Sequence, residues 1–267
     1  GFSAFEKHVV FAAIDTEKTK NAGFLEKYPV NVWPTLFFIE PSTGKVLYKW
    51  LGSADERQME SLLASAQSAR NVDSSHELLA LLSALAMGNQ HLQCAKTAND
   101  RFDSLKRAAD KVGAAAIGLG CALEMGESAE KQTLIDKLAA EGRALLGAED
   151  VMADDMSGLY DAVYQERVAR GESAAAIDVA KSWLTFLETE AGKAKTPAQR
   201  AVFDAHRLLA AMHTKQIDRV VDPITQSEKE LPADYNPPAR LAIAFRELNR
   251  LDDAKLAIDR ALRKCTE

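Results

Sequence analysis

The residues of this chain with the clearest potential for redox chemistry are three cysteines, Cys94, Cys121 and Cys265. Thiol–disulfide exchange needs an accessible thiolate and a second cysteine close by, and the sequence contains no Cys-x-x-Cys. Three widely spaced cysteines fit neither a disulfide framework nor paired zinc knuckles. We therefore expect Cys94 and Cys121 to be small buried residues in helix packing, and we assign no catalytic residue in this chain.

Two further motifs contain the residue types of a ligand site without its spacing. His91-x-x-Cys94 places two metal ligands on one helical face, whereas zinc takes three or four. Gly118-x-Gly120 lacks the preceding strand and the third glycine of a nucleotide-binding loop, and close helix packing explains it better. The sequence predicts no metal site and no cofactor.

Paired carboxylates occur at Asp154-Asp155 and at Asp252-Asp253. Both pairs lie near expected helix starts, where negative charge complements the helix dipole. We interpret them as helix-terminal residues, not as an acid–base pair.

The strongest candidate for a binding site is the dipeptide Trp33-Pro34. A cis peptide bond costs little before proline and usually serves a purpose where it occurs. The alternative is a turn that enters a strand, with Trp33 as a packing residue. We predict a cis bond here, and we assign Trp33 and Pro34 as candidate substrate-binding residues.

An α/β segment must position this dipeptide. Residues 9–14 form a continuous apolar run, which predicts a strand buried on both faces in a parallel sheet. Residues 19–28 read as a short helix, 33–40 as a second strand, and 45–51 as its hairpin partner after a turn. Further along, Met59, Leu62, Leu63 and Ala66 form the apolar stripe of an amphipathic helix.

The composition changes near residue 70, and the rest of the chain reads as helices. We place a linker at 69–75 and expect two domains, 1–70 and 76–267. Thr196-Pro197-Ala198-Gln199 is a capping box with proline at the first helical position. A 34-residue period fits the C-terminal part, and it predicts that Ala254, Ile258 and Ala261 pack against Leu241, Ala242 and Phe245.

The pattern Tyr28-x-Val30-x-x-x-Pro34-Thr35-x-x-Phe38, followed by Gly44-Lys45-Val46 and Gly52, resembles the C-terminal half of a thioredoxin domain. In that family the proline is cis and stands beside a redox Cys-x-x-Cys, and the backbone before it pairs with substrate peptide. The resemblance implies a missing first half, including the strand between 9–14 and 35–39. We therefore expect the sequence to be a fragment of a longer protein.

The 34-residue frame resembles tetratricopeptide repeats, which bind protein chains on a concave surface. The expected fold is thus an incomplete thioredoxin-like α/β domain followed by an all-α, tetratricopeptide-like domain. The leading hypothesis is a thiol–disulfide protein whose repeats recruit a protein or peptide client. The alternative is a non-catalytic interaction module in which the thioredoxin fold only holds a peptide.

The net charge and the hydropathy of the chain narrow the classes of partner that it could bind. The net charge is −6, and no cluster of basic residues marks a nucleic-acid or membrane surface. The longest near-apolar run, 78–87, is too short to span a bilayer. We predict no nucleic-acid and no membrane partner, and the sequence leaves the compartment unassigned.

Overall fold

The computed structural model describes residues 9–16, 18–30, 34–51, 59–60, 62–64, 66, 74–149 and 151–266. The chain divides into two compact units, 1–76 and 77–267, which are described separately below. Over the described residues the chain is mostly helical, with one small antiparallel sheet.

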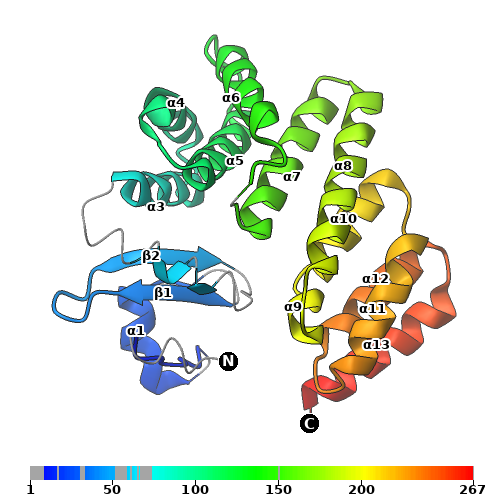
Figure 1. The fold of residues 1–267 in the computed structure, drawn as a ribbon. Helices are drawn as coiled ribbons and strands as arrows, with labels where there is room; N and C mark the ends of the chain where they lie inside the picture. Colours follow the sequence, from blue (N-terminus) through cyan, green and yellow to red (C-terminus); the bar gives the residue numbers. More distant parts are fainter. Residues whose placement is uncertain are drawn as a thin grey trace. The chain divides into compact units, whose positions relative to one another are not determined.

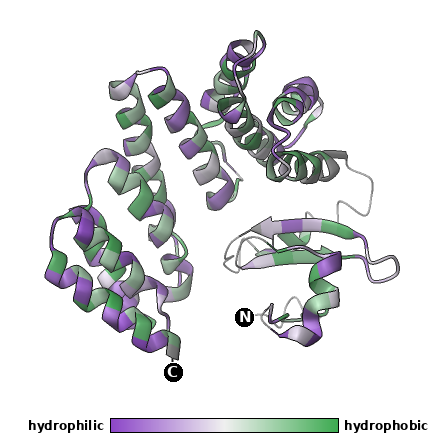
Figure 2. Cartoon of the chain, turned by 180° about the vertical axis from the view of Figure 1, so that it is seen from behind, coloured by the Kyte–Doolittle hydropathy of each residue, from purple (hydrophilic) through white to green (hydrophobic). Residues whose placement is uncertain are grey.

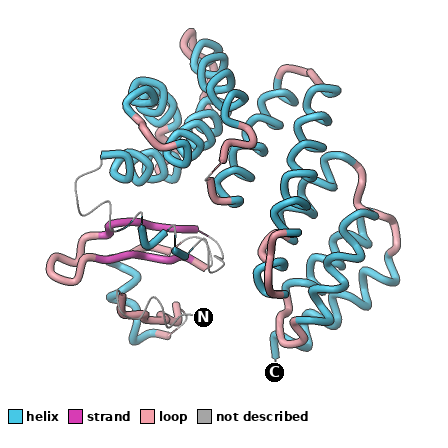
Figure 3. The backbone as a smooth tube through the Cα atoms, viewed as in Figure 1, coloured by secondary structure: helices cyan, strands magenta, loops and turns pink. Residues whose placement is uncertain are grey.

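The first unit is built on a β-hairpin (Figure 3). Strands β1 (Thr35–Ile39) and β2 (Val46–Leu51) pair antiparallel, with a register irregularity between Phe38 and Ile39. The turn between them places Gly44 at φ +66°, a conformation that favours glycine. The Tyr28 hydroxyl donates a 2.9 Å hydrogen bond to the Gly44 carbonyl, which fixes the turn to the preceding helix.

Short helices accompany the hairpin. A 3₁₀ turn η2 (Thr19–Asn21) leads into α1 (Ala22–Lys27), as the sequence predicts for 19–28. Residues 59–60, 62–64 and 66 are helical, and their Met59, Leu62 and Ala66 side chains are buried. The predicted amphipathic stripe is therefore formed.

The strand expected at 9–14 is not formed, and neither is a parallel sheet over the described residues. Residues 9–14 have no strand assignment, and the side chains from Val10 to Ile14 are exposed. A run of β-forming residues becomes a strand only when a neighbour satisfies its backbone groups. The sheet described here consists of β1 and β2 alone, so a thioredoxin-like sheet is not shown.

The second unit is all-α over its described residues (Figure 1), as the sequence predicts. Its helices are α3 (Ser74–Met87), α4 (His91–Arg101), the 3₁₀ turn η3 (Phe102–Ser104), α5 (Ala108–Glu124), α6 (Lys131–Leu145), α7 (Ala153–Ala169), α8 (Ser173–Gly192), α9 (Pro197–Ala201), α10 (Asp204–Thr214), α11 (Asp218–Glu230), α12 (Asn236–Glu247) and α13 (Leu251–Thr266). The predicted capping box is present at α9: the Thr196 hydroxyl accepts from the Gln199 amide, and the Gln199 side chain accepts from the Thr196 amide.

Four connections in this unit share one geometry, in which a residue with positive φ follows a helix. The next amide donates to the carbonyl five residues earlier, which satisfies the helix end and lets the chain reverse. The residues with positive φ are Asn89, Gly171, Lys215 and Asn249, which connect α3–α4, α7–α8, α10–α11 and α12–α13. Lys215 and Asn249 lie 34 positions apart, so the last two hairpins turn at equivalent points of a helical repeat.

The predicted packing of the last hairpin is wrong at Ile258, and Ala254, which was also expected to be buried, is half-buried. Leu241 and Ala261 are buried, and Phe245 packs against the core, but Ile258 is 40% exposed. Ala257 is fully buried in its place. The inner line of α13 thus runs through Ala257 and Ala261, with Ala257 in the place predicted for Ile258, because these small side chains allow close contact with α12.

Helices α4 and α5 approach closely at Gly118. A Cβ atom added at Gly118 would lie 2.5 Å from the Cβ of Ala98, so the glycine is required for this packing. Cys94 on α4 and Cys121 on α5 are buried there, as predicted, but they also form a disulfide, which the sequence argument did not anticipate.

We predict that this disulfide stabilises the second unit. Replacing Cys94 and Cys121 by alanine removes a cross-link between residues 27 positions apart and should lower the free energy of unfolding by about 2–4 kcal/mol. Chemical denaturation followed by circular dichroism measures the change. Cys265→Ala, which removes the exposed free thiol, is the control, and equal stability of the double variant and the native chain would contradict the prediction.

Candidate functional site

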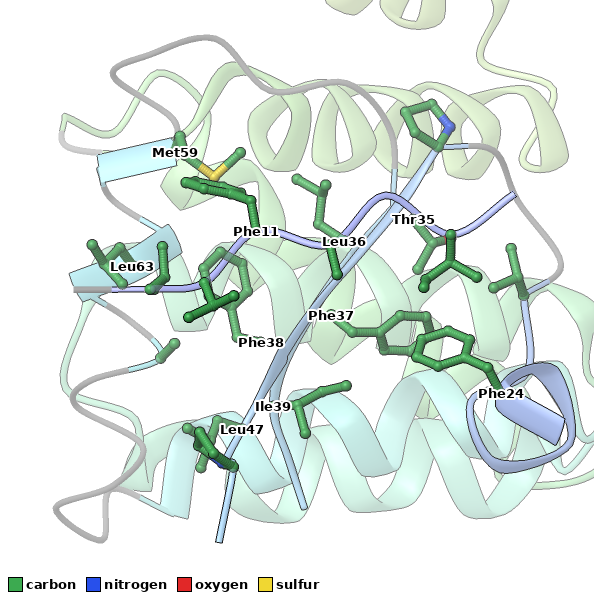
Figure 4. Close-up of a pocket in the computed structure, with 18 of the residues that line it drawn as sticks. Phe11, Phe24, Thr35, Leu36, Phe37, Phe38, Ile39, Leu47, Met59 and Leu63 are labelled. Carbon is green, nitrogen blue, oxygen red and sulfur yellow. The ribbon is translucent and has the colours of Figure 1, made fainter. Parts of the chain in front are cut away.

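An apolar groove of about 640 Å³ lies in the first unit, beside β1 (Figure 4). It is lined by residues 9–12, by both strands of the hairpin, and by the helical residues Met59, Leu63 and Ala66. Among its described lining residues, Thr16 and Thr35 have the only polar side chains, and none is charged. The groove is therefore suited to burying apolar groups and offers no acid, base or nucleophile beyond two hydroxyls.

Residues 36–39 of β1 are hydrophobic (Figure 2), and because successive side chains of a strand point to opposite faces, both faces of β1 carry apolar side chains. Phe37 lies beside Phe24, with ring centroids 6.4 Å apart, and 5.8 Å from the ring of Tyr28. Leu36 and Phe38 point to the opposite side of the strand, toward Phe11 and Leu63 (Figure 4). Side chains from both faces of this five-residue strand therefore line the groove.

Pro34, one of the two predicted binding residues, lines this groove at the start of β1. Trp33 lies outside the described residues, and so does the geometry of the Trp33-Pro34 peptide bond. Val10 and Phe11 also line the groove, although their side chains are 97% and 48% exposed. Large apolar side chains are thus open to solvent on one wall of the groove.

None of the three cysteines lines this groove. Cys94 and Cys121 form the buried disulfide of the second unit, and the one free cysteine, Cys265, is exposed on α13. The groove therefore contains no thiol.

Ionic clusters in the second unit have structural explanations. Glu166 on α7 is fully buried and pairs with Arg143 of α6 at 3.2 Å and with Arg170. Arg170 also pairs with Asp136, whose pKa is lowered chiefly by that hydrogen bond. A buried carboxylate held by the guanidinium groups of Arg143, Arg167 and Arg170 joins α6 to α7 and is already saturated by its partners.

The Asp154-Asp155 pair does begin a helix, α7, as predicted, but Asp155 has a further property. Burial, together with the charges of Asp154 and Asp110, raises the pKa of Asp155 to about 7. The Asp154 carboxylate lies within hydrogen-bond distance of His206 on α10, with 2.9 Å between Oδ1 and Nε2. Sequence reasoning missed this cluster, because Asp110 and His206 approach α7 only in the folded chain.

The remaining motifs stay structural. Gly118 packs against Ala98, as predicted, while a Cβ at Gly120 would meet nothing within 4 Å. No group of three or more metal-binding side chains occurs among the described residues, so His91 and Cys94 have no further ligands there. Within the same residues, no helix is long and apolar enough to cross a bilayer.

Comparison with known proteins adds no identity. No protein-family model, no curated protein and no solved structure matches this chain. The function must therefore be argued from the groove and from the helical unit.

The raised pKa of Asp155 predicts a pH-dependent stability. Between about pH 4 and pH 7 the folded chain holds a proton on this carboxyl that the unfolded chain releases, so the free energy of unfolding should fall as pH rises, by as much as about 4 kcal/mol. Asp155→Asn should remove that fall and make the variant more stable than the native chain above pH 7. Denaturation at several pH values measures it.

Asp252→Asn, in the first turn of α13, is the control for this prediction and should keep the native pH dependence. If native and Asp155→Asn chains show parallel pH profiles, the carboxyl ionises normally in the folded state and the prediction is wrong.

Proposed function

We propose that the chain is a protein-interaction module, in which the groove of the first unit holds an extended apolar segment of a client protein. The groove itself supports this proposal: it is lined almost wholly by apolar side chains and follows a β-strand. A chain segment laid along a strand can place alternate side chains into apolar pockets while its backbone remains extended. Because the described side chains that line the groove carry no charge, the groove is better suited to this binding than to acid–base catalysis.

The thioredoxin-like pattern supports the same proposal from the sequence. In that family the segment before the proline pairs with substrate peptide, and here Pro34 lines the groove at the start of β1. On this proposal, the first unit binds a peptide beside Pro34 and takes no part in thiol–disulfide exchange.

The helical unit offers a second surface for the client. Leu209 on α10 and Ile243 on α12 lie 34 positions apart and are both exposed. Ala205 and Ala239 occupy the preceding turns of the same helices and are exposed and half-buried, respectively. Equivalent apolar positions on neighbouring helices form the kind of repeating surface on which helical-repeat proteins bind chains.

Thiol–disulfide exchange, the leading hypothesis from the sequence, lacks support within this chain. Two of the three cysteines are locked in a buried disulfide, and Cys265 has no second cysteine to resolve a mixed disulfide. The non-catalytic alternative is therefore the one we propose.

The groove proposal predicts binding of an extended apolar peptide. A fluorescein-labelled peptide of about eight residues, alternating valine and leucine between terminal lysines, should bind with saturable fluorescence polarisation. Phe11→Glu places a charge on the exposed wall of the groove and should weaken binding about tenfold or more, because the carboxylate would have to be desolvated.

Leu92→Glu is the matched control, since Leu92 is a similarly exposed apolar residue on α4 of the other unit. Its affinity for the peptide should equal that of the native chain. Equal affinity of the Phe11→Glu variant, or no saturable binding by the native chain, would show that the groove does not bind such segments.

The chain should also lack disulfide reductase activity. With dithiothreitol as reductant, its rate of insulin reduction should equal that of a Cys94→Ser, Cys121→Ser, Cys265→Ser variant, because no accessible cysteine pair exists. A cysteine-dependent rate comparable to that of an intact thioredoxin would favour the redox hypothesis instead.

A further inference from the structure

The last helix, α13, exposes an apolar stripe. Leu251, Ile258 and Leu262 are 62%, 40% and 58% exposed. Together with Lys255 they follow a 4-3-4 spacing, which places all four along one line of the helix. This is the spacing of a coiled-coil seam, with one lysine among three large apolar residues.

Internal repetition indicates what kind of element covers such a stripe. Leu251 and Ile258 lie 34 positions after Ile217 and Ile224, the equivalent residues of the preceding hairpin. Ile217 is 7% exposed and Ile224 is fully buried, and both belong to a core that also contains side chains of α12. The same positions are thus covered by a helix in one hairpin and open in the next, so the fitting occupant of the α13 stripe is a helix.

We propose that this occupant is α13 of a second copy of the chain, packed antiparallel about a two-fold axis. The stripe is self-complementary in this direction: Leu251 would face Leu262 of the partner subunit, and Lys255 would face Ile258 of the partner subunit. Both pairings share one centre, as a symmetric interface requires. Each protomer contributes the same three apolar residues.

Charge fixes the direction of the pairing. In a parallel arrangement Lys255 would face Lys255 of the partner subunit, and two ammonium groups would meet inside the seam. In the antiparallel arrangement Lys255 lies beside Asp259 of the partner subunit. The first turn of α13 is acidic and its last turn is basic, so the ends of the two helices also attract each other when antiparallel.

Sedimentation equilibrium of the full chain over roughly 1–100 µM tests the association. We expect a concentration-dependent rise toward twice the chain mass. The double variant Ile258→Glu, Leu262→Glu should stay monomeric throughout, while circular dichroism verifies that it remains folded. Leu256→Glu is the matched control: Leu256 is 60% exposed on the same helix but lies off the stripe, so this variant should associate like the native chain.

Cysteine cross-linking tests the direction, in a Cys265→Ser background. The double variant Leu251→Cys, Leu262→Cys should form a disulfide-linked dimer on mild oxidation, whereas Leu251→Cys alone should not. A native chain that stays monomeric to 100 µM, a dimer that survives Ile258→Glu, Leu262→Glu, or cross-linking through Leu251→Cys alone would each overturn the proposal. The first outcome would leave the stripe to a helix of another chain.

Discussion

Incomplete burial is the constraint that shapes both units of this protein. A β-hairpin and a helical hairpin each have more apolar surface than their own two elements can cover, so each requires a third element. In the helical unit one hairpin is covered by the next. Ile224 of α11, for example, is fully buried in a core that also contains side chains of α12. Where it is not met, apolar side chains remain exposed to solvent: Val10 and Phe11 on the wall of the groove beside β1, and Leu251, Ile258 and Leu262 on the outer face of α13.

The two apolar surfaces that remain exposed differ in the kind of chain segment that fits them. The groove beside β1 is bordered by a strand and by the exposed residues Val10 and Phe11, so it suits an extended segment. The stripe on α13 has the spacing of a helix seam, so it suits a helix. The exposed positions Leu209 and Ile243 add a third apolar surface on repeating helices.

Local signals in the sequence predicted local structure well. The hairpin turn, the helix at 19–28 and the capping box at Thr196 depend on residues within a few positions, and the structure contains all three. The 34-residue period located the last two hairpins, but it did not resolve whether Ala257 or Ile258 faces inward. These residues differ by one position, and the size of the space against α12 decides between them.

Non-local features could not be predicted in the same way. The run at 9–14 has strand composition, but pairing depends on a neighbour that the local sequence does not specify. The pKa of Asp155 depends on Asp110, which is distant in sequence, and the groove is assembled from several segments that are separated in sequence. Pro34 was predicted as a binding residue from a family resemblance alone, because its place beside the groove depends on the fold and cannot be derived from its sequence neighbours.

The buried cystine sets an order on the making of this protein. Cys94 and Cys121 are 0% and 3% exposed once α4 has closed over α5, so no oxidant in solution can reach the sulfur atoms of the finished fold. Thiol oxidation proceeds through attack on an external disulfide and needs room for that reagent. The external disulfide is therefore attacked before α4 and α5 are fully packed, and the second cysteine completes the bond as the two helices come together. The conditions that the newly made chain meets first then decide which covalent form of the helical unit exists.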